Sequence, residues 1–147
     1  MTPGERDLIT AVFGDSFDSD AVRLRHRCWW PLQPSNVVMA PDGDIWFHPD
    51  CPHWREDFSE STLGLRALFV HELVHVWQHQ QGIRLPLRRW PLARYRYTLK
   101  PGKAFRRYGI EQQAMIVQHA YLSACADQTL ESEPPLIARV IAACSGG

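Results

Sequence analysis

The stretch 71-HELVHVWQHQQG-82 decides the fold of this chain. Apolar side chains recur at helical spacing before it and through it, so the pattern predicts one long helix over residues 62–81. Gly82 is expected to stop this helix, and Ser59 or Ser61 to cap its start. The apolar residues that carry the pattern are Leu65, Leu68, Phe69, Leu73, Val76 and Trp77.

Two imidazoles and a carboxylate in this helix have the spacing of a catalytic zinc site. Residues four apart share one face of a helix, so His71 and His75 can both bind a single Zn²⁺. Glu72 is rotated by about 100° from His71 and flanks the metal without ligating it. From that position it can act as the general base that takes a proton from a water on the metal. The motif therefore predicts a zinc cofactor and hydrolytic chemistry.

A catalytic zinc ion usually has three protein ligands, and Glu111 is our candidate for the third. It is the only acidic residue between the motif and Asp127, and it falls in the first turn of a helix predicted over residues 109–129. An acidic residue in a first turn also complements the helix dipole, so a role without metal stays open.

Other histidines are weaker candidates for the third ligand. His79 lies one further turn along the helix of the motif, and ligands on one straight helix spread by about 6 Å per four residues. That spread is too large for three ligands around one tetrahedral ion. His119, His48 and His53 are more typical of structural or cleft-lining residues.

A metallopeptidase also needs a hydrogen-bond donor for the oxyanion that develops during hydrolysis. Tyr108, three residues before Glu111, is our first candidate for this catalytic role. Tyr95 and Tyr97 are the alternatives, and tyrosines in such a segment more often simply pack.

Length and pattern predict one α+β domain that spans residues 1–147. The 147 residues are 45% hydrophobic and 22% charged, as in ordinary globular domains, and no apolar run is long enough for a membrane span. Around the central helix, the pattern predicts helices over 3–13, 109–129 and 135–144, a strand over 21–27, a hairpin over 37–48 and a β-ribbon over 93–99.

Two further features concern the compartment and the redox state of the protein. The N-terminus lacks a basic stretch followed by an apolar core, so we expect a cytoplasmic protein or one exported without a conventional signal peptide. Cys28, Cys51, Cys125 and Cys144 contain no CxxC pair, so we expect them to be reduced and packed.

The net charge of zero hides a basic segment over residues 84–107. No acidic residue lies between Glu72 and Glu111, whereas nine of the sixteen lysines and arginines do. These side chains either face solvent and the acidic remainder of the domain, or form a rim that receives an acidic protein or peptide substrate. Nucleic acid is a weaker alternative, because no nucleic-acid-binding module is recognisable. The nine are Arg84, Arg88, Arg89, Arg94, Arg96, Lys100, Lys103, Arg106 and Arg107.

The motif and its surroundings resemble a known group of bacterial proteins. HELVHVWQHQQG is similar to the core of small HExxH zinc metallopeptidases of the Vgr-related type, which are associated with contractile injection systems and polymorphic toxins. The resemblance covers roughly residues 3–125. Besides the motif, the matching segments are residues 13–15, 20–24, 43–49 and 108–114.

This resemblance implies a gluzincin-like minimal zincin, in which a small sheet packs beside the helix of the motif and the following helix that carries Glu111. It also implies His71, His75 and Glu111 as metal ligands and a secretion apparatus as a partner. The chain departs from the gluzincin pattern around the third ligand, where an Asn before the Glu and an Asp four residues after it are expected. Ile110 and Met115 stand there instead, so the residues that orient the zinc ligands must come from elsewhere.

Two functions follow from these patterns. The first is zinc-dependent hydrolysis of peptide bonds in a restricted protein target, with Glu72 as general base. The alternative is a catalytically weak or inactive zincin fold that serves as a binding or structural module of a secretion or toxin system. Glu72 favours the enzyme, because a purely structural metal site does not need a base.

Overall fold

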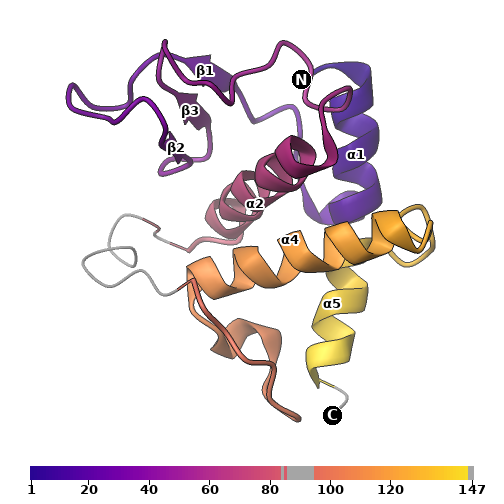
Figure 1. The fold of residues 1–147 in the computed structure, drawn as a ribbon. Helices are drawn as coiled ribbons and strands as arrows, with labels where there is room; N and C mark the ends of the chain where they lie inside the picture. The colour runs from indigo at the N-terminus through magenta and orange to yellow at the C-terminus, as the bar shows by residue number, and fades with distance from the viewer. Residues whose placement is uncertain (84, 86–94, 146–147) are drawn as a thin grey trace.

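The computed structural model describes residues 1–83, 85 and 95–145, and it mixes helices with one small sheet (Figure 1). The predicted α+β class is therefore confirmed, and the predicted helices begin and end close to their expected bounds. In chain order the elements are α1 (Pro3–Phe13), the 3₁₀ helix η1 (Gly14–Ser16), β1 (Leu24–His26), β2 (Val38–Met39), β3 (Ile45–Phe47), α2 (Leu63–Gln80), the 3₁₀ helix η2 (Phe105–Arg107), α4 (Ile110–Ala126) and α5 (Leu136–Ser145).

The first helix, α1, begins with a capping box. The Thr2 side chain accepts a hydrogen bond from the backbone N–H of Glu5, and Glu5 Oε2 accepts one from the backbone N–H of Thr2. The other carboxylate oxygen, Oε1, accepts the N–H of Phe58 at 3.0 Å. This one side chain therefore caps α1 and also fixes the loop that leads into α2. It does so from the interior, since Glu5 is only 1% exposed.

Replacement of Glu5 by alanine should lower the free energy of unfolding by about 2–4 kcal/mol. Loss of a helix cap costs about 1 kcal/mol, and a buried N–H left without an acceptor costs about 1–3 kcal/mol. Urea denaturation of Glu5→Ala measures this, with Asp7→Ala, at an exposed position of the same helix, as the matched control. Equal midpoints for the two variants would contradict this role of Glu5.

The sheet has the order β1-β3-β2, with β3 in the middle. β2 and β3 pair antiparallel with Val38 opposite Phe47, which confirms the predicted hairpin, and β1 pairs with β3 in parallel. The predicted strand over 21–27 is shorter than expected, because only its middle residues 24–26 pair with β3. The predicted β-ribbon over 93–99 is wrong for residues 95–99, which pair with no strand of the described chain; residues 93 and 94 lie outside the described residues.

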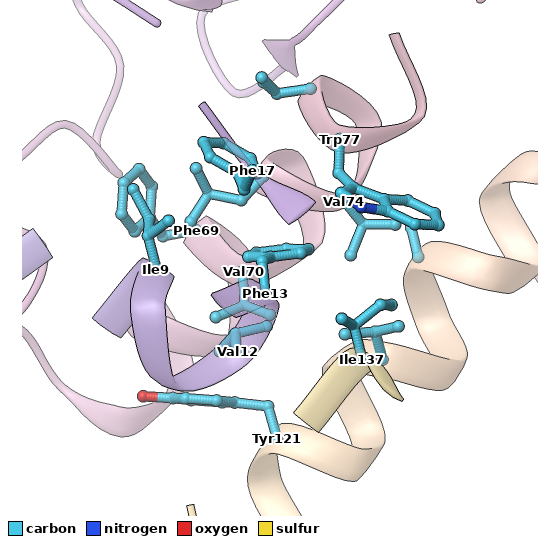
Figure 2. Packing of buried hydrophobic residues seen from close by; sticks show 14 of the residues in the cluster. Ile9, Val12, Phe13, Phe17, Phe69, Val70, Val74, Trp77, Tyr121 and Ile137 are labelled. Atoms are coloured by element: carbon cyan, nitrogen blue, oxygen red, sulfur yellow. The ribbon is translucent and has the colours of Figure 1, made fainter. Parts of the chain in front are cut away.

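Helix α2 is the centre of the molecule. It packs most extensively on α4 and also contacts α1 and β3, and every residue from Phe69 to Gln78 is buried. Figure 2 shows the apolar part of this packing, where Val70 and Val74 of α2 meet side chains of α1, α4 and α5. The cap of α2 is Thr62, which accepts the N–H of Leu65, rather than the expected serines.

No described helix is both long and apolar enough to cross a bilayer. Helix α2 is buried on nearly all sides over residues 69–78. Since His71, Glu72, His75 and Gln78 are among its buried residues, each needs polar partners in the interior.

Candidate metal centre

His71, His75 and Glu111 lie together in the interior of the protein, where one ligand atom from each falls within 4.8 Å of the others. Glu111 Oε2 lies 3.0 Å from His75 Nε2 and 3.4 Å from His71 Nε2. All three side chains are buried. The structure thus brings together the three residues that were predicted as ligands, although Glu111 lies far from the two histidines in the sequence.

The packing of α2 on α4 creates this arrangement (Figure 1). The two histidines stand one turn apart on α2, and their ring centroids are 5.0 Å apart. Gly109 is the N-cap of α4, so Glu111 falls in the first turn of that helix and faces the histidines. Two nitrogens and a carboxylate oxygen form the donor set that catalytic zinc sites use.

Glu72 lies beside this donor set and is only 5% exposed. Its Oε2 is buried and has no hydrogen-bond partner among the described residues. A buried carboxylate oxygen without a partner is costly, and a water or cation at the centre would satisfy it. The cluster could therefore hold a metal ion, with the unpartnered oxygen of Glu72 beside it.

The acidic groups of the site act on the pKa of His71. Burial on its own lowers this pKa, but the hydrogen bond to Glu111, the charges of Glu72 and Glu111 and the contact with Gln118 outweigh it and raise the pKa above its ordinary value. The site is thus electrostatically suited to a positive charge, which a divalent cation would provide in place of the proton.

Two glutamines that the sequence reasoning missed contact the outer nitrogens of the histidines. Gln118 Oε1 lies 3.0 Å from His71 Nδ1, and Gln78 Oε1 lies 2.8 Å from His75 Nδ1. This chain has Ile110 and Met115 where the gluzincin pattern has Asn and Asp, and the two glutamines are the side chains that contact the outer histidine nitrogens. Gln78 follows His75 by three residues on one helix, so helical spacing could have indicated that pair.

The other histidines make contacts away from the donor set. The exposed His79 ring lies against Gly43. A Cβ atom added to Gly43 would stand 2.8 Å from the Cδ2 atom of His79. His119 Nδ1 is 2.7 Å from the Tyr97 hydroxyl, and His48 Nδ1 accepts the N–H of Asp50. Among the described residues only one group of three or more His, Cys, Asp or Glu has metal-binding geometry, and neither these residues nor His53 belongs to it.

The tyrosines proposed as oxyanion donors lie in different places. The Tyr108 hydroxyl accepts the N–H of Lys100 at 2.9 Å, and the Lys103 ammonium lies 4.0 Å from the centroid of its ring. The Tyr95 ring, by contrast, stacks on His71 with centroids 6.5 Å apart. Tyr95 therefore adjoins the candidate metal centre, whereas the hydrogen bond and the cation contact of Tyr108 involve neither histidine.

A shallow groove runs from Tyr95 along α4. It encloses about 610 Å³, and its wall includes Met115, one turn beyond Glu111 on α4. Its lining residues are Tyr95, Arg96, Tyr97, Thr98, Met115 and His119. Tyr95 lines this groove and also stacks on His71, so it stands between the groove and the candidate metal centre.

The basic segment is described only in part. Arg84, Arg88, Arg89 and Arg94 lie outside the described residues. Arg96 lines the groove. An acidic substrate therefore stays a prediction.

Comparison with known proteins shows that the chain is similar to part of a spike protein of a bacterial secretion system. No family model matches it. It is 41% identical over 130 residues to the type VI secretion system spike protein VgrG2b of Pseudomonas aeruginosa, a match that covers 83% of this chain and 13% of that protein. The solved effector domain of VgrG2b from the same organism has a TM-score of 0.79 and 39% identity, over 89% of this chain and 77% of the solved one.

Proposed function

This chain belongs to the family of the VgrG2b effector domain, and on that premise we propose that residues 1–147 form a single domain that hydrolyses peptide bonds with a zinc ion. The observation that carries the proposal is the buried donor set of His71, His75 and Glu111 beside an unpartnered oxygen of Glu72. This set favours a minimal zincin, in which the helix of the motif and the next helix share the metal.

The zinc ion would be held by the Nε2 atoms of His71 and His75 and by the Glu111 carboxylate. When bound, zinc polarises the scissile carbonyl as a Lewis acid and lowers the pKa of water to about 7. Glu72 then accepts the proton of the attacking water at its free Oε2 and delivers it to the leaving amine. Because Glu72 is buried, bulk water does not compete for hydrogen bonds to its carboxylate.

Tyr95 is the donor that the structure favours for the developing oxyanion, because its ring contacts a zinc ligand. Its phenol is half exposed, so a substrate that occupies the groove would lie against it. The groove that begins at Tyr95 would hold the peptide on one side of the scissile bond, against Met115 and Tyr97.

Replacement of Tyr95 by phenylalanine should lower kcat by at least about tenfold with little change in zinc content. The loss should stay below the 10²–10³-fold that follows removal of a donor from a water-excluded site, since Tyr95 is half exposed. Tyr108→Phe is the matched control and should retain most of the wild-type kcat. A larger loss in Tyr108→Phe than in Tyr95→Phe would restore Tyr108 as the donor.

The likeness to a spike protein's effector domain supports a place for this chain in a type VI secretion system. We infer that its partner is the secretion apparatus, that it is exported without a conventional signal peptide, and that its substrate is a protein of restricted identity. The chain corresponds to 13% of the spike protein's length.

The proposal is tested by the zinc dependence of cleavage. The zinc-loaded chain is incubated with a bacterial protein extract, and new peptide N-termini are identified by mass spectrometry. We expect cleavage products that disappear after zinc is removed with a chelator and return when zinc is restored. If zinc-loaded and zinc-free chains give the same N-termini, the chain is not a zinc peptidase.

A further inference from the structure

Gln78 links the two halves of the candidate metal centre. Its side chain has no exposed surface. The amide oxygen lies 2.8 Å from His75 Nδ1 on the same helix, and the amide nitrogen donates at 3.0 Å to the backbone carbonyl of Ile110 on α4. The same nitrogen donates at 3.0 Å to Gln113 Oε1. Because Glu111 follows Ile110 directly, one amide joins a histidine ligand to the backbone that presents the carboxylate ligand.

The direction of these hydrogen bonds is fixed from the α4 end. Backbone carbonyls only accept hydrogen bonds. Gln113 must therefore turn its NH₂ group to the carbonyl of Tyr108, at 2.8 Å, and its oxygen to Gln78. Gln78 in turn must direct its NH₂ group to Ile110 and its oxygen to His75. A flipped Gln78 amide would place its oxygen against two acceptor oxygens in a buried site.

The tautomer of His75 follows from this direction. An amide oxygen can only accept, so Nδ1 of His75 must carry a proton and donate it to Gln78. Nε2 is then the nitrogen that is available to a metal ion, and it is also the nitrogen that lies 3.0 Å from Glu111 Oε2.

We propose that Gln78 is the positioning residue of the metal centre: it holds His75 with Nε2 towards the ion and ties it to the start of α4. This inference rests on the proposed zinc site. The neutral amide of Gln78 accepts the hydrogen bond from His75 Nδ1. A carboxylate often accepts this hydrogen bond from a zinc-bound histidine. At position 78 a carboxylate could not replace the amide, because an ionised Glu would have no N–H for the carbonyl of Ile110.

Gln118, which contacts His71 Nδ1, differs from Gln78 in this respect. It is partly exposed, and the hydrogen bonds of the described residues fix no direction for its amide. Of the two histidines, only His75 therefore has its tautomer fixed by its glutamine partner.

The test compares zinc affinity in Gln78→Met and Gln80→Met. Gln80 is the matched control, since it lies on α2 and both donates to and accepts from the backbone of Asp18, away from the histidines. Competition with a chromophoric chelator should give a zinc Kd that is about 10–100-fold higher in Gln78→Met and unchanged in Gln80→Met. The visible spectrum of the cobalt-substituted protein should change only in Gln78→Met. Equal Kd values and spectra for both variants would overturn the proposal.

A measurement on the wild-type protein covers the case in which Gln78→Met does not fold. Long-range nitrogen–proton NMR spectra of the zinc-loaded chain should show His75 with its proton on Nδ1 and the metal on Nε2. Metal on Nδ1 of His75 would overturn the proposal. If zinc binds as expected and depends on Gln78 but no peptide is cleaved, the proposed hydrolysis fails while the role of Gln78 stands.

Discussion

Glu72→Gln is expected to bind zinc like the wild type and to lose peptide hydrolysis by about 10²–10⁴-fold, the usual contribution of a general base. The amide has nearly the shape of the carboxylate but cannot accept the proton of the attacking water. Glu72 is not among the three residues whose ligand atoms converge, so its replacement should leave zinc content unchanged. The measurements are kcat/KM on a cleaved peptide and zinc content of the same preparation.

Glu60→Gln is the matched control for this prediction. Glu60 is exposed in the loop before α2, so the same chemical change there should leave kcat/KM at the wild-type value. Wild-type activity in Glu72→Gln would remove Glu72 as the general base, and simultaneous loss of zinc would make it a residue that the metal site needs for assembly.

Glu111→Ala is expected to weaken zinc binding by more than the 10–100-fold that loss of an outer-shell partner produces. The reason is that it removes one of three donors and leaves the two histidines of α2 as the remaining pair. Zinc Kd from chelator competition measures the effect. Melting temperatures with and without zinc add a second reading, since an ion that binds only the folded state raises the melting temperature by an amount that grows with the logarithm of its affinity.

Asp127→Ala is the control for loss of an acidic side chain from the same helix, because Asp127 stands at the opposite end of α4 as its C-cap. Its zinc Kd should equal that of the wild type. If Glu111→Ala also kept the wild-type Kd, Glu111 would complement the helix dipole without binding metal.

The sequence predicted the parts of this site that depend on local periodicity. Apolar spacing located α2, and four-residue spacing placed His71 and His75 on one face of it. Glu111 was found because it is an isolated acidic residue in the first turn of a predicted helix. These residues lie in the helices where the sequence places them, because helical geometry is set by neighbours within one or two turns.

Contacts between distant segments were less accessible to prediction. Parallel pairing of β1 with β3 joins residues about twenty positions apart, and period-two alternation over 21–27 gave no sign of the partner or of the strand's short length. Alternation of aromatic and basic residues led to a ribbon over 93–99, yet Tyr95 and Tyr97 instead contact His71 and His119. The contact between Gln118 and His71 depends on the packing of two helices, which sequence spacing does not reveal.

The most direct test of the zinc centre is elemental analysis of the purified chain after saturation with zinc and removal of excess ion. We expect one zinc ion per wild-type chain, and substantially less in His71→Ala and His75→Ala prepared in parallel. A folded wild-type chain without stoichiometric zinc, or histidine variants that retain the full amount, would contradict a centre built by His71, His75 and Glu111.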